Sequence, residues 1–234
     1  MDDNHTQAIA CTNLAVGYRG EVVLSDISFT VPSGSTLAIV GRSGCGKSTM
    51  LKTLAGILPP LGGQASVLAV DLPAIPPAGT VGYIPQGLGL VPHETVLQNV
   101  LCGRLAGLGP VRSLLGRFPK TVRMDAADAI DRVGLQGKHH VRVKELSGGQ
   151  RRRVAIARAF VQRPQVLLAD EMLSELDHET AASIVRCLAD LQTDTTMTVV
   201  VVEHDIDVAN RIADAVLAVD GDGVDRTELA VVNT

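Results

Sequence analysis

The chain of 234 residues predicts an α/β fold built on a mainly parallel sheet. Three short apolar runs carry this prediction: TLAIV at 36–40, QVLLA at 165–169 and TMTVVVV at 196–202. None of them alternates with polar residues, which is typical of parallel strands buried on both faces. Helical segments lie between the runs, so strands and helices are expected to alternate in a single core.

The N-terminal part has a different pattern. The stretch VVLSDISFTVPSG at 22–34 alternates apolar and polar residues, as a strand does when one face is buried and the other is solvated. We therefore expect an antiparallel β subdomain at the N-terminal edge of the core.

Two segments predict helices of the core. KSTMLKTLAGILPP begins at Lys47, where Gly56 is expected to cap the helix and two prolines prevent it from resuming. HETAASIVRCLADLQ at 178–192 is the second. The polar, turn-rich tail at 220–234 predicts at most one hairpin.

Residues 87–163 show helical periodicity broken by glycine- and proline-containing turns, with few β-branched clusters. We interpret this stretch as a helical subdomain inserted into a single domain of residues 1–234. The core then consists of about 1–86 and 164–234.

Composition narrows the function classes. The hydrophobic content is 46%, which suits a packed globule, and the net charge of −4 argues against a protein whose main role is to bind nucleic acid. The cysteines form no CxxC pair, so neither a disulfide framework nor a zinc site is indicated, and a reducing cytosol fits best. The sequence shows neither a secretory signal nor an apolar run long enough to span a bilayer, so at a membrane another chain would have to do the spanning.

GRSGCGKST at 41–49 fits the pattern G-x-x-x-x-G-K-[ST] and lies between a predicted strand and a predicted helix. Small residues let the backbone N–H groups of such a loop surround phosphates, and the helix directs its positive end at the same charge. Lys47 is expected to reach the β- and γ-phosphates of ATP, and Ser48 to ligate Mg²⁺. The alternative is a glycine-rich turn without a ligand. We assign nucleotide binding to the whole loop: Gly41, Arg42, Ser43, Gly44, Cys45, Gly46, Lys47, Ser48 and Thr49.

Asp170 and Glu171 follow the apolar run that ends at residue 169. Open parallel sheets bind ligands at the carboxyl ends of their strands, so Asp170 is expected beside Mg²⁺ and Glu171 beside the attacking water. Otherwise the pair merely begins a loop. His204 emerges beyond the third run, and a lone histidine there is more often solvated or a satisfied core residue. Beside a nucleotide, a neutral imidazole would bond the γ-phosphate and orient Glu171.

LSGGQRRRVAIARA at 146–159 predicts a helix that starts at Ser147, because Ser147 and Gln150 have the spacing of a capping box. Glycines at 148 and 149 lower helix stability, so something is expected to approach the backbone closely. The three arginines at 151–153 oppose the helix dipole unless an anion or an acidic surface is near. They are equally compatible with a solvated face.

The LSGGQ motif, the phosphate loop and VLLADE at 166–171 together resemble the ATP-binding subunit of ABC transporters, and the resemblance spans nearly the whole chain. It implies a P-loop NTPase core and a head-to-tail homodimer or pseudo-dimer. Two ATP molecules would lie between the phosphate loop of one subunit and Ser147, Gly148, Gly149 and Gln150 of the other.

Further site residues follow from the same resemblance. Tyr18 in VGYRG matches the aromatic residue that stacks on adenine, although it also fits a plain aromatic residue at a strand end. Gln86 in GYIPQ matches the glutamine that couples Mg²⁺ and water to the membrane subunit. Asp177 matches the aspartate of the loop that crosses the dimer interface, but Met172, Leu173 and Glu175 depart from the family's usual residues there. The departure leaves the timing between subunits open.

About 60 residues separate Gln86 from Leu146, too few for a long coiled coil, which disfavours chromosome-maintenance and DNA-repair relatives. Membrane transport is the leading class. TVLQNVLCGRLAGLGPVRSLLGRFPK resembles ATPases of phosphonate importers, whereas LAGILPPLGGQASVLAVDLP also resembles those of metal-ion importers. The other alternative is a soluble ATP-driven switch that acts on a macromolecular complex.

The resemblance also implies the surroundings of the chain. It would be peripheral at the cytoplasmic face of the cell membrane and bound to polytopic permease subunits, which a solute-binding protein serves. We expect a helix of the permease to dock on residues 91–117, where an ordinary surface helix pair is the alternative.

Overall fold

The computed structural model describes residues 7–107, 118–173, 176–219 and 228–231. Its centre is a six-stranded sheet in the order β10 (Glu228–Val231), β9 (Ala215–Val219), β3 (Thr36–Gly41), β8 (Thr198–Glu203), β7 (Val166–Asp170) and β6 (Val81–Ile84). Strands β9 to β6 of this series pair in parallel, and β10 is antiparallel to β9. The predicted mainly parallel sheet is confirmed.

A second sheet is antiparallel and has the order β2 (Glu21–Pro32), β1 (Gln7–Tyr18), β4 (Gly62–Val67) and β5 (Val70–Asp71). The strand predicted from the alternation at 22–34 is β2, which lies at the edge of this sheet. The N-terminal antiparallel subdomain is therefore confirmed.

The six-stranded sheet separates two apolar cores. Leu37 and Ile39 face a core shared with the antiparallel sheet and with α1 (Lys47–Leu54), whereas Ala38 and Val40 face a core built with helices. Every residue of β7 and β8 is buried. Full burial explains why their sequences show no polar alternation.

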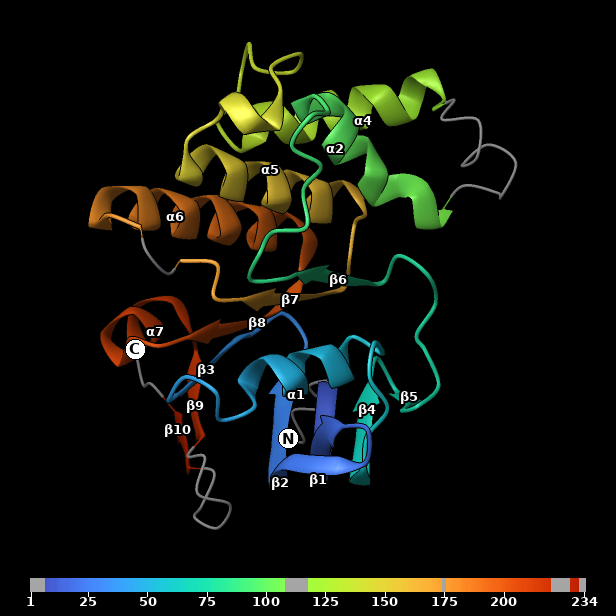
Figure 1. The fold of residues 1–234 in the computed structure, drawn as a ribbon, viewed down its shortest axis with the longest axis vertical. Helices are drawn as coiled ribbons and strands as arrows, with labels where there is room; N and C mark the ends of the chain where they lie inside the picture. The colour runs from blue at the N-terminus through green and yellow to red at the C-terminus, as the bar shows by residue number, and fades with distance from the viewer. Residues whose placement is uncertain (1–6, 108–117, 174–175, 220–227, 232–234) are drawn as a thin grey trace, which may run out of the picture.

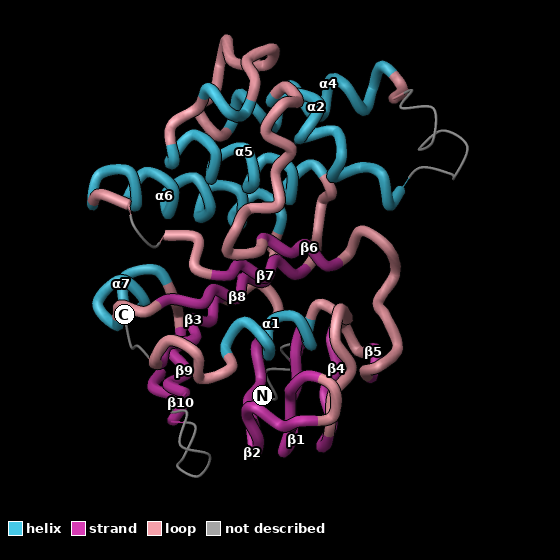
Figure 2. The backbone as a smooth tube through the Cα atoms, in the orientation of Figure 1, coloured by secondary structure: helices cyan, strands magenta, loops and turns pink. Residues whose placement is uncertain are grey.

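Most of the helices lie on one side of the six-stranded sheet, as Figure 1 shows. The long helices α5 (Gly148–Val161) and α6 (His178–Thr195) cover one face of the six-stranded sheet, and α1 lies on the other, between the two sheets. Shorter elements lie beyond or beside these helices: α2 (Val96–Leu101), η1 (Cys102–Gly107), α4 (Lys120–Arg132), η2 (Val143–Glu145) and α7 (Ile206–Ile212). Figure 2 shows the same separation of helix and strand layers.

Residues 87–107 and 118–163 contain helices and no named strand. The cluster that includes Val100 and Ile130 continues without a break into the face of the sheet that carries Ala38. The boundaries of the inserted helical subdomain at 87 and 163 remain a prediction.

Three local expectations can be compared with the structure. The strand predicted from residue 196 starts at Thr198, because Thr196 adopts a left-handed conformation (φ 51°) and ends α6. The expected capping of α1 by Gly56 is confirmed: Gly56 follows Ala55 in a left-handed conformation (φ 70°), and the N–H groups of Gly56 and Ile57 donate to the carbonyl oxygens of Thr53 (3.0 Å) and Lys52 (2.9 Å). In the tail, β10 pairs with β9, and residues 220–227 lie outside the described residues.

Two further expectations concern chemistry and membranes. All four cysteines are free: Cys11, Cys45, Cys102 and Cys187. Within the described ranges, every helix is too short or too polar to cross a lipid bilayer.

Candidate active site

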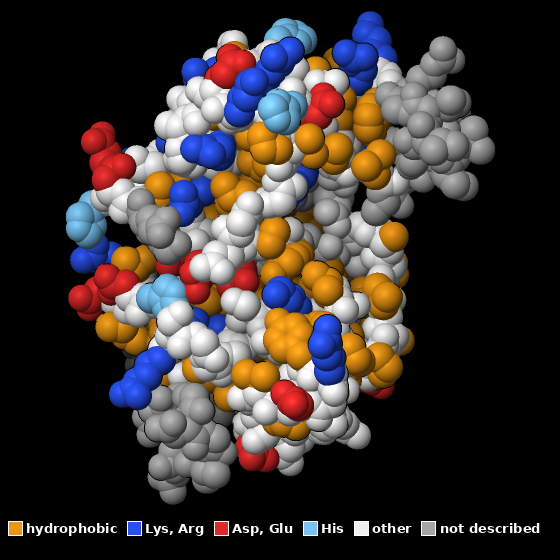
Figure 3. Space-filling model, in the orientation of Figure 1, with side chains coloured by type: hydrophobic (Ala, Val, Ile, Leu, Met, Phe, Trp, Pro, Cys, Tyr) orange, Lys and Arg blue, Asp and Glu red, His pale blue; other side chains and the backbone are white. Residues whose placement is uncertain are grey.

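The predicted catalytic segments follow neighbouring parallel strands. The phosphate loop follows β3, Asp170 ends β7 with Glu171 directly after it, and His204 follows β8. Since these strands are parallel, their carboxyl ends meet at one edge of the sheet. Figure 3 shows acidic and histidine side chains gathered at this edge, and a contact of 2.6 Å between Glu171 Oε1 and His204 Nε2 shows that the ends of β7 and β8 meet there.

The phosphate loop is tightly packed at its start. A side chain at Gly41 would place its Cβ 2.2 Å from the carbonyl oxygen of Val219, so only glycine fits there. Lys47 is 4% exposed, and its Nζ donates to the carbonyl oxygens of Gly41 (2.7 Å) and Arg42 (2.8 Å). The loop therefore holds the Lys47 ammonium group against two backbone carbonyls at the N-terminus of α1. A cation and a helix N-terminus together provide a site that is suited to an anion.

Ser48 and Asp170 form the oxygen-rich part of the site. Ser48 Oγ donates to Asp170 Oδ1 over 2.9 Å, and Asp170 is 2% exposed. Burial raises the pKa of Asp170, while the hydrogen bond from Ser48 acts in the opposite direction. Hydroxyl and carboxylate oxygens are the ligands that Mg²⁺ prefers, so the residues present fit this ion.

Glu171 is the centre of the residues that were predicted to be catalytic. His204 Nε2 lies 2.6 Å from Glu171 Oε1, and Gln86 Nε2 donates to Glu171 Oε2. The Glu171 side chain is 12% exposed, and its backbone has a left-handed φ of 51°. That conformation costs a non-glycine residue about 1–3 kcal/mol and persists only where the surroundings fix it, which is typical of functional sites. The structure thus brings Gln86, Glu171 and His204 together.

Sequence reasoning missed Glu203, the last residue of β8. It is 3% exposed, and its Oε1 accepts a hydrogen bond from Leu173 N over 3.2 Å. Burial raises the pKa of Glu203 to about 7, with the hydrogen bond from Leu173 opposing the shift. The signal was a carboxyl group directly after four valines, which continue a fully buried strand.

Tyr18 lies beside the helix that the phosphate loop starts. It is 40% exposed, Lys52 Nζ donates to its hydroxyl over 3.3 Å, and the Lys52 ammonium is 5.8 Å from the ring centroid. Hydrogen bonding with Thr49 lowers the pKa of Tyr18. An exposed aromatic face next to α1 is consistent with base stacking, which remains a prediction.

The expected capping box at the start of α5 is present. Ser147 Oγ accepts from Gln150 N (3.3 Å), and Ser147 N donates to Gln150 Oε1 (3.2 Å). A Cβ at Gly149 would lie 2.6 Å from Thr180 Cγ2, whereas at Gly148 the nearest atom would be an Arg152 nitrogen at 3.7 Å. The close approach expected at these glycines thus comes partly from within the chain, at Gly149.

The arginines after this motif have different environments. Arg151 is exposed, whereas Arg152 Nε donates to the carbonyl oxygen of Met172 over 2.7 Å. Arg153 donates to the carbonyl oxygen of Val133 over 2.8 Å and to Ser183 Oγ. Backbone carbonyls of the same chain therefore bind two of the three, and only Arg151 fits the solvated face.

The loop predicted to cross a dimer interface leads into α6. Asp177 caps that helix by accepting a hydrogen bond from Thr180 N over 2.9 Å, and this bond lowers the pKa of Asp177. The atypical Met172 and Leu173 are buried, at 1% and 5% exposure. Glu175 lies outside the described residues.

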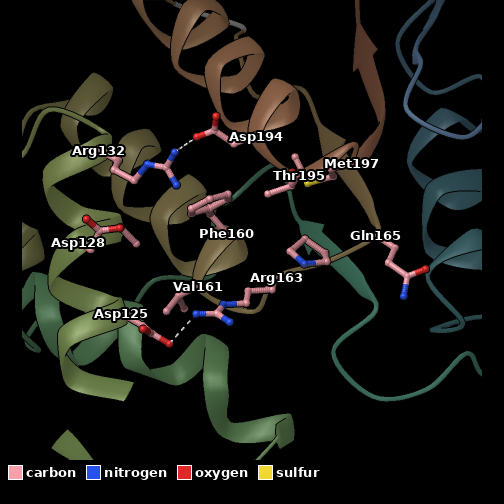
Figure 4. Close-up of a pocket in the computed structure, with 12 residues that line it drawn as sticks. Asp125, Asp128, Arg132, Phe160, Val161, Arg163, Gln165, Asp194, Thr195 and Met197 are labelled. Atoms are coloured by element: carbon pink, nitrogen blue, oxygen red, sulfur yellow. Dashed lines mark hydrogen bonds and ion pairs between the residues drawn. The ribbon is translucent and has the colours of Figure 1, made fainter. Parts of the chain in front are cut away.

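Two hollows lie away from the phosphate loop. The first, of about 410 Å³, lies among α4 and the C-terminal ends of α5 and α6 (Figure 4). Two ion pairs lie in its lining: Arg132 pairs with Asp194, and Arg163 with Asp125 at 3.1 Å. None of the predicted site residues lines it.

The second hollow, of about 580 Å³, lies next to Gln86. Its walls are 86–92, 143–144, the start of α5 and Leu176. Pro92 is the one lining residue within the stretch 91–117 that was predicted to meet a permease helix, and 108–117 lie outside the described residues.

Comparison with known proteins identifies the family of the chain. A family model described as ABC transporter matches residues 24–174. The phosphonates import ATP-binding protein PhnC of Trichormus variabilis is 39% identical over 91% of this chain and 89% of that protein. The protein of the same name from Nitratidesulfovibrio vulgaris is 42% identical over 85% of this chain and 77% of its own length.

Solved structures agree at the level of the fold. A metal-chelate type ABC transporter in an inward-facing conformation has a TM-score of 0.82 and 28% identity, covering 97% of this chain and 84% of the other. A dimeric bacterial ABC transporter cassette has a TM-score of 0.81 and 27% identity, covering 97% and 99%. The chain belongs to the family of ATP-binding proteins of ABC transporters.

Proposed function

We propose that this chain binds and hydrolyses ATP as one of two cassettes that power a membrane importer of phosphonate or a related oxyanion. The observation that carries the ATPase assignment is the arrangement of Glu171 between Gln86 and His204, beside the buried pair of Ser48 and Asp170. The solute class rests on the curated relatives, which include phosphonate importers and a hypophosphite import protein of Stutzerimonas stutzeri that is 36% identical.

Binding begins at the phosphate loop. The N–H groups of Gly41 to Thr49 surround the phosphates, and Lys47 donates to the β- and γ-phosphate oxygens. Tyr18 supports the adenine ring. Ser48, Asp170 and Gln86 are the residues that would hold Mg²⁺, which neutralises phosphate charge when bound.

Hydrolysis needs a base that is already oriented. Glu171 accepts a proton from water as the water oxygen attacks the γ-phosphorus, and the bond to the oxygen that bridges the β- and γ-phosphates breaks to release ADP and phosphate. His204 and Gln86 fix the two oxygens of Glu171, so that the carboxylate does not have to reorganise during the reaction. His204 and Lys47 also stabilise the charge on the γ-phosphate.

The second half of each site comes from a partner. In one chain, α5 and α1 lie against opposite faces of the sheet, so the start of α5 is separated from the nucleotide that the chain's own phosphate loop would bind. Ser147 and Gly148 are exposed there and can contact a nucleotide held by a second copy. Its capped N-terminus suits an anion, and Asp177 lies at the start of the helix that contacts Gly149. The hollow next to Gln86 would receive a permease helix at the cytoplasmic face of the membrane.

The base is tested by Glu171→Gln, which keeps the shape of the side chain and removes its basicity. Turnover should fall by roughly 10²–10⁴-fold while ATP binding is retained. Glu179→Gln, at an exposed position in α6, is the matched control and should hydrolyse normally. ATP hydrolysis at the normal rate by Glu171→Gln would show that the assignment is wrong.

The solute is tested in cells. Deletion of the coding sequence should abolish growth on a phosphonate as the sole phosphorus source and leave growth on phosphate intact. The second candidate is metal-ion import, which the likeness to a metal-chelate type transporter favours. Loss of metal-chelate uptake with normal phosphonate uptake would decide for it.

A further inference from the structure

The segment from Glu171 to Leu173 is held by three hydrogen bonds from two elements, β8 and α5. Glu171 N donates to the carbonyl oxygen of Val202 over 3.1 Å. The carbonyl oxygen of Met172 accepts from Arg152 Nε over 2.7 Å, and Leu173 N donates to Glu203 Oε1 over 3.2 Å. Each of three successive residues is therefore bound at its backbone, to β8, to α5 and again to β8.

These contacts answer a physical need. Met172 and Leu173 are buried and lie outside any strand or helix, so their backbone groups cannot be satisfied by regular secondary structure. A buried N–H or C=O group without a partner is costly, and side chains must supply what water cannot. Arg152 and Glu203 supply it from two sides.

The direction of the Glu171 side chain depends on this segment. With φ at 51°, Glu171 turns the chain sharply out of β7, and this turn directs its carboxylate at His204 and Gln86. A residue in this conformation relaxes unless its neighbours prevent it. The fixed backbone at Met172 and Leu173 is what prevents it.

We propose that Arg152 and Glu203 are positioning residues, which hold the 171–173 segment so that the Glu171 carboxylate faces its two partners. Arg152 lies two residues after Gln150 on α5. The helix start assigned to the partner's ATP is thus bonded directly to the segment that carries the base of the chain's own site. The inference rests on the proposed function, because it concerns the same base.

The charged groups around Glu203 come from three elements. They are His204, which follows β8, Glu171, which follows β7, and Arg152 on α5.

The proposed role of Glu203 requires only an oxygen that accepts the hydrogen bond from Leu173 N, and the amide oxygen of a glutamine can take the same place. An uncharged Glu203→Gln should therefore keep the positioning, whereas Glu203→Met should lose it.

The experiment measures steady-state ATP hydrolysis by the full chain, by Glu171→Gln and by four further variants. Arg152→Met and Glu203→Met should each lower kcat by roughly 10- to 100-fold with KM for ATP and nucleotide affinity within about twofold of the original, since a small misplacement of a catalytic group has effects of this size. Glu203→Gln should retain kcat within about threefold. Arg123→Met, an exposed arginine on α4, is the control for loss of an arginine and should be unchanged.

Each outcome is decisive. If Arg152→Met and Glu203→Met keep the original kcat while Glu171→Gln is inactive, the positioning role is overturned and the proposed function stands. If Glu171→Gln is fully active, the base itself is misassigned. Should Glu203→Met fail to fold, Arg152→Met decides alone, and equal loss in kcat and nucleotide affinity there would indicate general damage and overturn the proposal.

Discussion

Glu203 is a carboxyl group with almost no access to water, and burial raises its pKa to about 7. Between its ordinary value of 4.5 and 7, the folded chain holds a proton that the unfolded chain has released. Glu203 therefore favours folding most at low pH, and this contribution is lost as pH rises through 7. The loss amounts to at most about 3 kcal/mol.

Urea unfolding at several pH values between 5 and 8 checks this prediction. The free energy of unfolding of the original chain, minus that of Glu203→Gln, should fall as pH rises. Subtracting the variant removes the titrations that the two chains share. A difference that does not change with pH would show that Glu203 titrates normally.

Lys47 concerns binding. Its buried ammonium group donates to two carbonyl oxygens of the phosphate loop, and in the proposed complex it donates to phosphate. A hydrogen bond to a charged group contributes about 1.5–3 kcal/mol, so Lys47→Ala should weaken ATP binding by roughly 10- to 100-fold. Equilibrium binding of a fluorescent ATP analogue measures this, with Lys120→Ala on α4 as the control. Unchanged affinity for the analogue would count against ATP binding by Lys47 and the phosphate loop.

At the scale of elements, the start of α5 shows how two adjacent glycines differ. Gly149 packs on Thr180 of α6, where a Cβ would lie 2.6 Å from Cγ2. Gly149→Ala should therefore destabilise the fold by about 1–3 kcal/mol, which thermal unfolding measures. Adding Thr180→Ser removes the clashing methyl group and should restore most of the loss. A stable Gly149→Ala would mean that α6 yields at no cost.

The elements that sequence predicted well share one property: a local pattern determines them. Unbroken apolar runs gave β3, β7 and β8, alternation gave β2, and the spacing of Ser147 and Gln150 gave the start of α5. The phosphate loop followed from its residue types between a strand and a helix. In each case the local preference of neighbouring residues for a strand, a helix start or a loop agrees with the structure that the whole chain adopts.

What sequence did not show depends on contacts between distant segments. Arg152 and Met172 are 20 residues apart, and Leu173 and Glu203 are 30 apart, so no local pattern indicates that they meet. The arginines at 151–153 look alike in the sequence, but Arg152 bonds to Met172, Arg153 bonds to Val133 and Ser183, and Arg151 is exposed. The left-handed turn at Glu171 likewise follows from its surroundings and not from residue type.

For the whole molecule, the decisive prediction concerns two copies. Ser147→Arg places a long cation where the proposed partner's ATP would lie, so ATP-dependent dimerisation should be lost while one chain still binds ATP. Sedimentation in the Glu171→Gln background, which retains ATP, measures this. Ser147→Ala loses the same cap, about 0.5–2 kcal/mol, without added bulk, and should dimerise better than Ser147→Arg. Normal dimerisation of Ser147→Arg would contradict the shared site.

The sheet that separates α1 from α5 has a consequence for how much ATP the cell spends on this protein. If α5 cannot reach the nucleotide bound beside α1 of its own chain, solitary copies made in excess would hold ATP without hydrolysing it. Specific activity in dilute solution should then climb with protein concentration instead of staying constant. ATP hydrolysis would start only where a membrane complex binds two copies, so that surplus copies would hydrolyse little ATP.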